Sequence, residues 1–185
     1  MKRIFIIHGW GFAPRNNFYP WLKSELEKLG YKVFAPDMPD TDTPVIEAWV
    51  NHLRDLVGTP DKNTYFIGHS IGCQTILRYL ETISTPVGGA IFVAGWFDLE
   101  NLDDEEQEIA KPWATTLINL KKVKMVLPKS TLIVSDDDPF GAVEENKKKF
   151  AELCSKIVVL HKAGHITKKD GYKELPEALL EFKEL

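Results

Sequence analysis

The stretch "GHSIG" places Ser70 between two glycines, where its hydroxyl could act as a nucleophile. A short apolar run, Tyr65–Gly68, precedes the serine, and a stretch with helical apolar spacing, Ile71–Leu80, follows it. A serine on a sharp strand-to-helix turn is typical of a nucleophile elbow, and flanking glycines relieve the collisions that such a turn creates. The competing interpretation of Ser70 is a helix N-cap.

A serine hydroxyl attacks a carbonyl carbon only when a base takes its proton, so the elbow requires a histidine and a carboxylate that orients it. In enzymes with such an elbow, both partners follow the serine in chain order. Only His161 and His165 follow Ser70. His161 directly continues an apolar run that predicts a strand, whereas His165 lies in the loop beyond it. Open α/β sheets bind ligands at the carboxyl ends of their strands, so we favour His165 as the base.

The candidate acid lies in "SDDDPF", which offers Asp136, Asp137 and Asp138 at the end of a predicted strand. Three adjacent carboxylates cannot all be buried as ions, because burying an unpaired charge is costly. Asp138 precedes Pro139, whose ring keeps the preceding residue out of the helical backbone region. We therefore expect Asp138 to orient the histidine, with Asp137 as the alternative. A turn and helix cap is the competing interpretation of the whole cluster.

The oxyanion that forms when a carbonyl is attacked needs two N–H donors. We expect one donor to be the backbone N–H of Ile71, directly after the serine. The loop "HGWGF", which follows the first predicted strand, would supply the second donor from Trp10. The positions expected to contact a substrate are His8, Gly9, Gly11, His69, Trp96 and Phe97.

The elements that must hold these residues alternate between short β-rich runs and longer amphipathic stretches, which predicts βαβ units and a parallel sheet. Several runs are almost entirely apolar, as strands covered by helices on both faces must be. The predicted strands are Arg3–Ile7, Lys32–Ala35, Tyr65–Gly68, Gly89–Ala94, Thr131–Ser135 and Ile157–Leu160. We expect a three-layer α/β/α sandwich with about six parallel strands in the order 2-1-3-4-5-6. Its switch point lies between the first and third strands, which end in "HGWG" and "GHS".

Apolar spacing near 3.6 residues predicts helices in the segments between these strands. The expected helices are Phe18–Leu29, Val45–Val57, Ile71–Leu80, Ala142–Leu153 and a terminal helix that begins at Pro176. The one irregular region is 96–129, which opens with an acidic cluster and contains Pro112. We interpret this region as a loop with helical pieces or as a small cover over the site.

Length and composition predict one globular domain, residues 1–185. The net charge of -4 disfavours nucleic acid as a partner, and no basic amphipathic stretch suggests membrane binding. The apolar run near the N-terminus is too short for a signal peptide, so we expect a cytoplasmic protein. The two cysteines, Cys73 and Cys154, form no metal or disulfide pattern and are expected to be buried. We expect no metal and no organic cofactor.

Taken in order, these motifs resemble those of the small serine hydrolases related to retinoblastoma-binding protein 9, a compact branch of the α/β-hydrolase fold. The resemblance rests on "HGW", "APDMPD", "GHSIG", "SDDDPF" and "AGH", and it covers nearly the whole chain. It implies a triad of Ser70, Asp138 and His165. The family's eponymous partner binds through a Leu-x-Cys-x-Glu peptide, whereas the nearest stretch here, "ELCSK", ends at Lys156. The resemblance therefore does not imply partner binding.

The sequence thus predicts a serine hydrolase that cleaves small carboxylic esters through an acyl-enzyme. Amide or peptide hydrolysis would use the same site, but it requires protonation of an amine leaving group. A non-catalytic scaffold that binds a small ligand or a partner is the alternative outside enzymes, because a fold does not fix a function. The expected partner is a small ester molecule, and the sequence leaves monomer and homodimer open.

Overall fold

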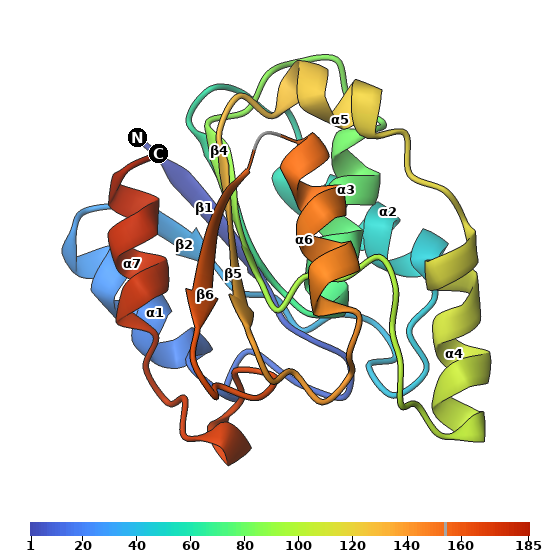
Figure 1. The fold of residues 1–185 in the computed structure, drawn as a ribbon. Coiled ribbons are helices and arrows are strands. Elements are labelled where there is room, and N and C mark those ends of the chain that lie inside the picture. The colour runs from blue at the N-terminus through green and yellow to red at the C-terminus, as the bar shows by residue number, and fades with distance from the viewer. Residues whose placement is uncertain (154) are drawn as a thin grey trace.

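A six-stranded parallel sheet with the strand order β2-β1-β3-β4-β5-β6 forms the centre of the computed structural model (Figure 1). The strands are β1 (Arg3–Ile7), β2 (Lys32–Phe34), β3 (Thr64–His69), β4 (Gly89–Val93), β5 (Ser130–Ser135) and β6 (Lys156–Leu160). The structure describes residues 1–153 and 155–185, so the burial expected for Cys154 lies outside the described residues. The parallel sheet and its strand order confirm the expectation from the sequence.

Helices cover both faces of this sheet and so complete three layers (Figure 1). One face carries α1 (Tyr19–Lys28) and α7 (Pro176–Lys183). The other face carries α2 (Ile46–Val57), α3 (Ile71–Leu80), α5 (Leu120–Val126) and α6 (Val143–Glu152). The remaining described helical elements are α4 (Asp104–Thr115) and the 3-10 helix η1 (Lys168–Asp170). The five expected helices are observed as α1, α2, α3, α6 and α7, with ends within one or two residues of those expected.

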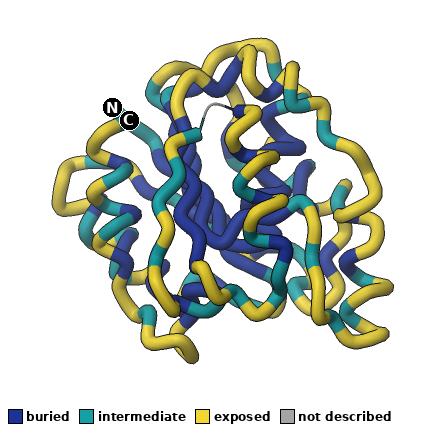
Figure 2. The backbone as a smooth tube through the Cα atoms, in the orientation of Figure 1, coloured by how far each residue is buried: buried dark blue, intermediate teal, exposed yellow. Residues whose placement is uncertain are grey.

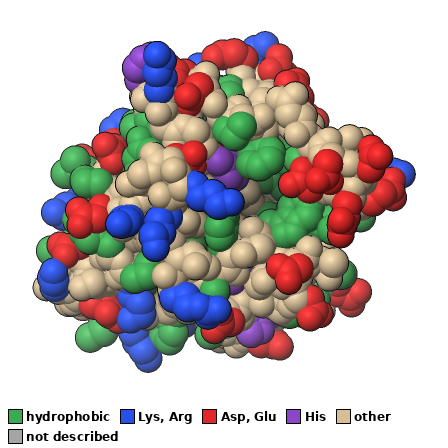
Figure 3. All heavy atoms as spheres, turned by 90° about the horizontal axis from the view of Figure 1, so that it is seen from below, with side chains coloured by type: hydrophobic (Ala, Val, Ile, Leu, Met, Phe, Trp, Pro, Cys, Tyr) green, Lys and Arg blue, Asp and Glu red, His purple; other side chains and the backbone are tan. Residues whose placement is uncertain are grey.

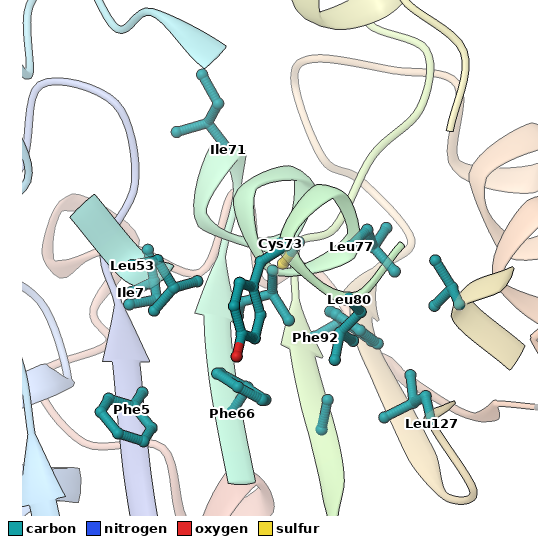
Figure 4. Packing of buried hydrophobic residues seen from close by; sticks show 14 of the residues in the cluster. Phe5, Ile7, Leu53, Phe66, Ile71, Cys73, Leu77, Leu80, Phe92 and Leu127 are labelled. Atoms are coloured by element: carbon teal, nitrogen blue, oxygen red, sulfur yellow. The ribbon is translucent and has the colours of Figure 1, made fainter. Parts of the chain in front are cut away.

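Alternation along β1 divides the buried core into two clusters, one on each face of the sheet. Ile4 and Ile6 pack with α1 and α7, whereas Phe5 and Ile7 pack with α2, α3 and α6. Figure 2 shows the buried strands at the centre, enclosed by the more exposed helices and loops. In Figure 4, Phe66 lies beneath α3 together with side chains of that helix. The central strands β3, β4 and β5 are buried throughout, because helices cover both of their faces.

The irregular region 96–129 contains the two helices α4 and α5. Asp103 and Glu106 form a capping box at the start of α4, in which each side chain accepts a hydrogen bond from the other's backbone N–H. The helix continues through Pro112 to a buried Trp113, whose indole N–H donates to the Pro44 carbonyl oxygen at 2.9 Å. The region is thus the loop with helical pieces that the sequence suggested, anchored at both ends of α4.

Two leucines offer a matched test of the core. Leu132 of β5 is fully buried, whereas Leu180 of α7 is 60% exposed. We expect Leu132→Ala to lower the free energy of unfolding by about 2–5 kcal/mol, because it removes buried atoms and leaves a cavity. Leu180→Ala should change that free energy by less than about 0.5 kcal/mol. Urea unfolding followed by circular dichroism measures both values, and equal losses would contradict the described packing.

Candidate active site

Ser70 occupies the sharp turn between β3 and α3. Its backbone angles are φ 53° and ψ -123°, a strained conformation that costs on the order of 1–3 kcal/mol. The flanking glycines show how the chain accommodates this turn. A Cβ added at Gly68 would lie 2.8 Å from the Cys73 backbone nitrogen, and one added at Gly72 would collide with the Ile7 carbonyl oxygen. Residues without a side chain are therefore required on both sides of the serine.

The side chain of Ser70 does not cap the helix. The residue stands at the N-cap position of α3, but its hydroxyl makes no capping hydrogen bond. The residue is 9% exposed and lines a cavity of about 390 Å³ at the carboxyl edge of the sheet. This placement favours the elbow interpretation over the helix-cap interpretation.

Asp138 and His165 form a largely buried hydrogen-bonded pair beside the same cavity. Nδ1 of His165 lies 2.8 Å from Oδ2 of Asp138, and the two side chains are only 10% and 12% exposed. Because a carboxylate only accepts, Nδ1 of His165 carries the proton and Nε2 is free to accept one. Within the described residues, no hydrogen bond joins the Ser70 hydroxyl to His165. Such bonds often tighten only in the complex with substrate.

Asp136 and His161 form a separate pair on the surface. The Asp136 carboxylate accepts from the His161 ring at 2.7 Å and from the Lys162 N–H at 2.8 Å. The Lys162 N–H and then the His161 ring hold the pKa of Asp136 below its usual value, and Asp136 in turn raises the pKa of His161. The His161 side chain is 77% exposed and does not line the cavity. Its placement therefore leaves His165 as the candidate base.

Asp137 bonds the main chain next to His165, the candidate base, and does not bond the His165 ring. Its carboxylate accepts from the Ser135 hydroxyl at 2.6 Å and from the Gly164 N–H at 2.9 Å, and these bonds lower the pKa of Asp137. Of the three aspartates, Asp138 is the one that hydrogen-bonds the His165 ring. The three adjacent carboxylates thus bind three successive parts of one loop, which explains how they are tolerated side by side.

Two backbone N–H groups beside the elbow, those of Ile71 and Trp10, are the expected oxyanion donors. Ile71 is the first residue of α3, where an N–H has no acceptor within its own helix. In the loop after β1, the N–H groups of Gly9 and Gly11 are already bonded to other parts of the protein. The N–H of Trp10, between them, has no acceptor within the described residues, and Trp10 lines the cavity.

Two histidines expected to contact a substrate, His8 and His69, lie buried behind the cavity instead. His8 accepts from a backbone N–H at 3.0 Å and donates to the Gly9 carbonyl oxygen at 2.8 Å. The His69 ring bonds the Tyr19 hydroxyl at 2.7 Å and the His165 carbonyl oxygen at 2.9 Å. Neither ring nor Gly9 lines the cavity. Burial lowers the pKa of both rings, that of His69 to about 3.

The cavity has mostly apolar walls, and its charged residues lie at the margin. Its large apolar side chains are Trp10, Phe12, Trp96, Leu99, Leu102 and Phe140. Glu106 and Lys169 are among the charged residues of the lining. Figure 3 looks onto this edge and shows hydrophobic side chains between lysine or arginine side chains on one side and an acidic cluster on the other. The largest acidic cluster therefore lies on one side of the cavity, while Lys169 and Asp170 line it from another segment.

The segment after β4 contributes Trp96, Leu99 and Leu102 to the lining of this cavity. Phe97, the neighbour of Trp96, points elsewhere. Its ring packs on Phe150 at a centroid distance of 5.1 Å, and it is not part of the lining. The sequence analysis missed the two leucines, although apolar residues inside the acidic stretch "DLENLDDEEQE" were a signal that one side of it is covered.

The carboxylates of Glu106 and Asp170 in the cavity lining are bonded to nearby main-chain N–H groups. Among residues 1–153 and 155–185, no three His, Cys, Asp or Glu side chains converge as metal ligands. The carboxylates of Glu106 and Asp170 accept from the backbone N–H groups of Asp103 and Thr167, respectively.

Within residues 1–153 and 155–185, no helix has both the length and the apolar character needed to cross a membrane.

Sequence comparison places these residues in a known family. The pattern of the family described as serine hydrolase matches residues 4–184. The chain belongs to the serine hydrolase family. YdeN of Bacillus subtilis (strain 168) is 28% identical over 181 residues, which cover 95% of this chain and 91% of YdeN. The serine hydrolase RBBP9 of Rattus norvegicus is 28% identical over 163 residues, which cover 85% of this chain and 82% of RBBP9.

Solved structures give the same answer for the fold. The crystal structure of YdeN matches with a TM-score of 0.90 at 25% identity and covers 100% of both chains. Est1E from Butyrivibrio proteoclasticus, solved with ferulic acid bound, matches with a TM-score of 0.74 at 13% identity and covers 98% of this chain and 86% of Est1E. At that identity the likeness to Est1E shows the fold alone. The resemblance to the small serine hydrolases and the α/β-hydrolase fold are confirmed.

The three aspartates provide a test with internal controls. Asp138→Asn should lower kcat by a factor on the order of 10⁴, because the tautomer of His165 is no longer held. Asp136→Asn should keep kcat within about fivefold of wild type, since exposed pairs contribute little. Steady-state hydrolysis of a soluble ester measures both variants. If Asp137→Asn proved the most damaging and Asp138→Asn mild, the assignment of Asp138 would be wrong.

Proposed function

We propose that this protein hydrolyses small carboxylic esters through an acyl-enzyme formed on Ser70. The observation that carries the proposal is the hydrogen-bonded pair of Asp138 and His165 at the cavity that the strained serine also lines. A hydroxyl on an elbow, a base with a fixed tautomer and two free N–H groups are the parts that acyl transfer requires. Membership of the serine hydrolase family supports the same class of reaction.

Acylation begins when Oγ of Ser70 attacks the carbonyl carbon and Nε2 of His165 takes the hydroxyl proton. The N–H groups of Ile71 and Trp10 stabilise the negative charge that develops on the carbonyl oxygen. The bond from the carbonyl carbon to the leaving oxygen then breaks, and His165 gives its proton to the departing alcohol. Asp138 keeps the proton on Nδ1 and stabilises the imidazolium with its charge.

Water completes the cycle by the same steps. It attacks the acyl carbon while His165 takes one of its protons, and the bond to Oγ of Ser70 breaks. Ser70 recovers its proton from His165, and the carboxylic acid leaves. An amide would follow the same path, but its amine must be protonated before it departs. An ester, whose alcohol is the better leaving group, is therefore the substrate that we propose.

The size and lining of the cavity support a small, neutral substrate. Its volume of about 390 Å³ is near the lower end of the roughly 300–1,000 Å³ that ligand pockets span. Glu106 at one margin disfavours an anion on that side. We propose a soluble ester as the partner, with neither nucleic acid nor a membrane involved. The cytoplasm is the proposed location, in keeping with the free, buried thiol of Cys73.

Covalent labelling tests the nucleophile without any guess about substrate. A fluorophosphonate probe should label the wild-type protein at Ser70, and Ser70→Ala should abolish labelling, because the attacking oxygen is gone. Ser130→Ala is the matched control, since Ser130 is also buried but lies outside the cavity. Labelling that persists in Ser70→Ala would contradict the assignment of Ser70 as the nucleophile. Absence of labelling in wild type would favour a non-catalytic scaffold.

Acyl-chain length tests the proposed substrate class. Esters with acyl chains of about two to four carbons should be hydrolysed with a higher kcat/KM than long-chain esters, because the cavity is small and aromatic side chains form much of its wall. A series of p-nitrophenyl esters, kept below their solubility limits, measures the profile. A kcat/KM that rises steadily through octanoate and beyond would show an open, lipid-binding groove instead.

A further inference from the structure

Three buried polar side chains behind the elbow, Asn17, Tyr19 and His69, take no part in the acyl-transfer steps above. The Tyr19 hydroxyl lies 2.7 Å from Nδ1 of His69, and Nε2 of His69 lies 2.9 Å from the carbonyl oxygen of His165. The side-chain amide of Asn17 and the backbone N–H of Gly9 both donate to the Tyr19 hydroxyl, each at 3.2 Å. These contacts form one chain of hydrogen bonds from the loop after β1 to the main chain of His165.

Donors and acceptors in this chain can be assigned, because one arrangement satisfies every group. The Tyr19 oxygen receives two N–H donors, so its own proton goes to Nδ1 of His69. The proton of His69 therefore stands on Nε2 and is donated to the carbonyl oxygen of His165. A doubly protonated His69 would bring a third donor to the Tyr19 oxygen, which has only two lone pairs.

The hydrogen-bond chain links the segments that carry the nucleophile, the base and the proposed oxyanion donor of the loop after β1. His69 directly precedes Ser70, and Gly9 directly precedes the proposed oxyanion donor of the loop. A Cβ added at Gly9 would lie 3.2 Å from Nδ1 of His69, so the two segments are in close contact. Asn17 adds a second link to the loop of the base, because its side-chain oxygen accepts from the Lys168 N–H at 3.0 Å.

We propose that His69 is a positioning residue, whose Nε2–H bond to the carbonyl oxygen of His165 holds the base where it can take the proton of Ser70. The inference rests on the proposed function, since it concerns the same base. The rings of Phe12 and Phe18 also pack on His69, with centroids 6.0 and 5.5 Å away. A role in packing alone is therefore the alternative that a test must separate.

The neutral state of His69 suits the charge cycle of the base. The rings of His69 and His165 are 5.2 Å apart, and His165 becomes cationic during each acylation. Burial, and then the neighbouring His165, lower the pKa of His69 to about 3, so that it stays uncharged and does not repel the cation. The titratable groups that face His69 are Tyr19 of α1, His165 of its loop and His8 at the end of β1, and none is a carboxylate.

Two amide substitutions separate positioning from packing. In His69→Gln the side-chain N–H₂ can still reach the carbonyl oxygen of His165, whereas the shorter amide of His69→Asn reaches only Tyr19. We expect His69→Gln to keep kcat within about fivefold of wild type. His69→Asn should lower kcat by about 10- to 100-fold with KM within about twofold, because a misplacement of about 1 Å costs on the order of 10²-fold.

Further variants control for the loss of buried polar groups. Tyr19→Phe removes both the acceptor of the Gly9 N–H and the donor to His69, so it should lower kcat as His69→Asn does. Tyr79→Phe and His52→Gln are the matched controls, since buried atoms of both side chains have no hydrogen-bond partner within the described residues. Both controls should keep the kcat of wild type, and thermal unfolding checks that each variant folds.

Nitrogen NMR of the imidazole rings tests the hydrogen-bond chain without a substrate. In wild type we expect His69 to remain neutral and protonated on Nε2 from about pH 5 to 9. Titration of His69 in that range would overturn the inference, even if His69→Asn fails to fold. Equal kcat values in His69→Gln and His69→Asn would also overturn the inference. In that case an active wild-type enzyme would still support the proposed function. A wild-type protein that hydrolyses no ester would contradict the proposed function. The NMR measurement would still test whether Nε2 of His69 carries the proton that the hydrogen bond to His165 requires.

Discussion

The backbone of α3 packs directly against the end of β1 at Gly72, which faces the carbonyl oxygen of Ile7. No side chain fits between the two segments at this point. This close approach lets the chain leave β3 and enter α3 in one strained residue, Ser70. The same approach brings the loop after β1 against the serine, so the two proposed oxyanion donors lie in the segments that follow the adjacent strands β1 and β3. Strain at Ser70 persists because the packed helix and sheet around it leave the chain no relaxed alternative.

Much of this arrangement could be predicted because parallel sheets obey simple rules. Apolar runs bounded by glycine and polar residues predicted the strands, since both faces of the central strands are buried. All parallel strands end at one edge, so residues that follow β1, β3, β5 and β6 had to converge there. Chain order then left two histidines and three aspartates as partners for Ser70. Family membership follows from the same motifs, whose order extends over nearly the whole chain.

Other features could not be predicted, because sequence spacing does not reveal which way a loop side chain points. His8 and His69 adjoin the cavity residues in the sequence, yet both rings turn into the protein and bond main-chain groups. Phe97 turns away from the cavity to pack on Phe150, whereas its neighbour Trp96 lines it. The helix α4 was obscured by Pro112, although Asp103 and Glu106 at capping-box spacing were a usable signal.

Residues that lie within a few positions of one another differ in protonation state and in access to the cavity, because they are buried to different degrees. The thiol of Cys73 is fully buried behind the elbow, and burial raises its pKa, so it stays protonated and cannot compete as a nucleophile. His69 is buried as well and stays neutral, whereas His165 has Asp138 to stabilise a positive charge. Ser70, whose hydroxyl makes no capping hydrogen bond, lines the cavity. The strained turn thus selects which polar residues of the edge face a substrate, and the buried ones hold the loops that present them.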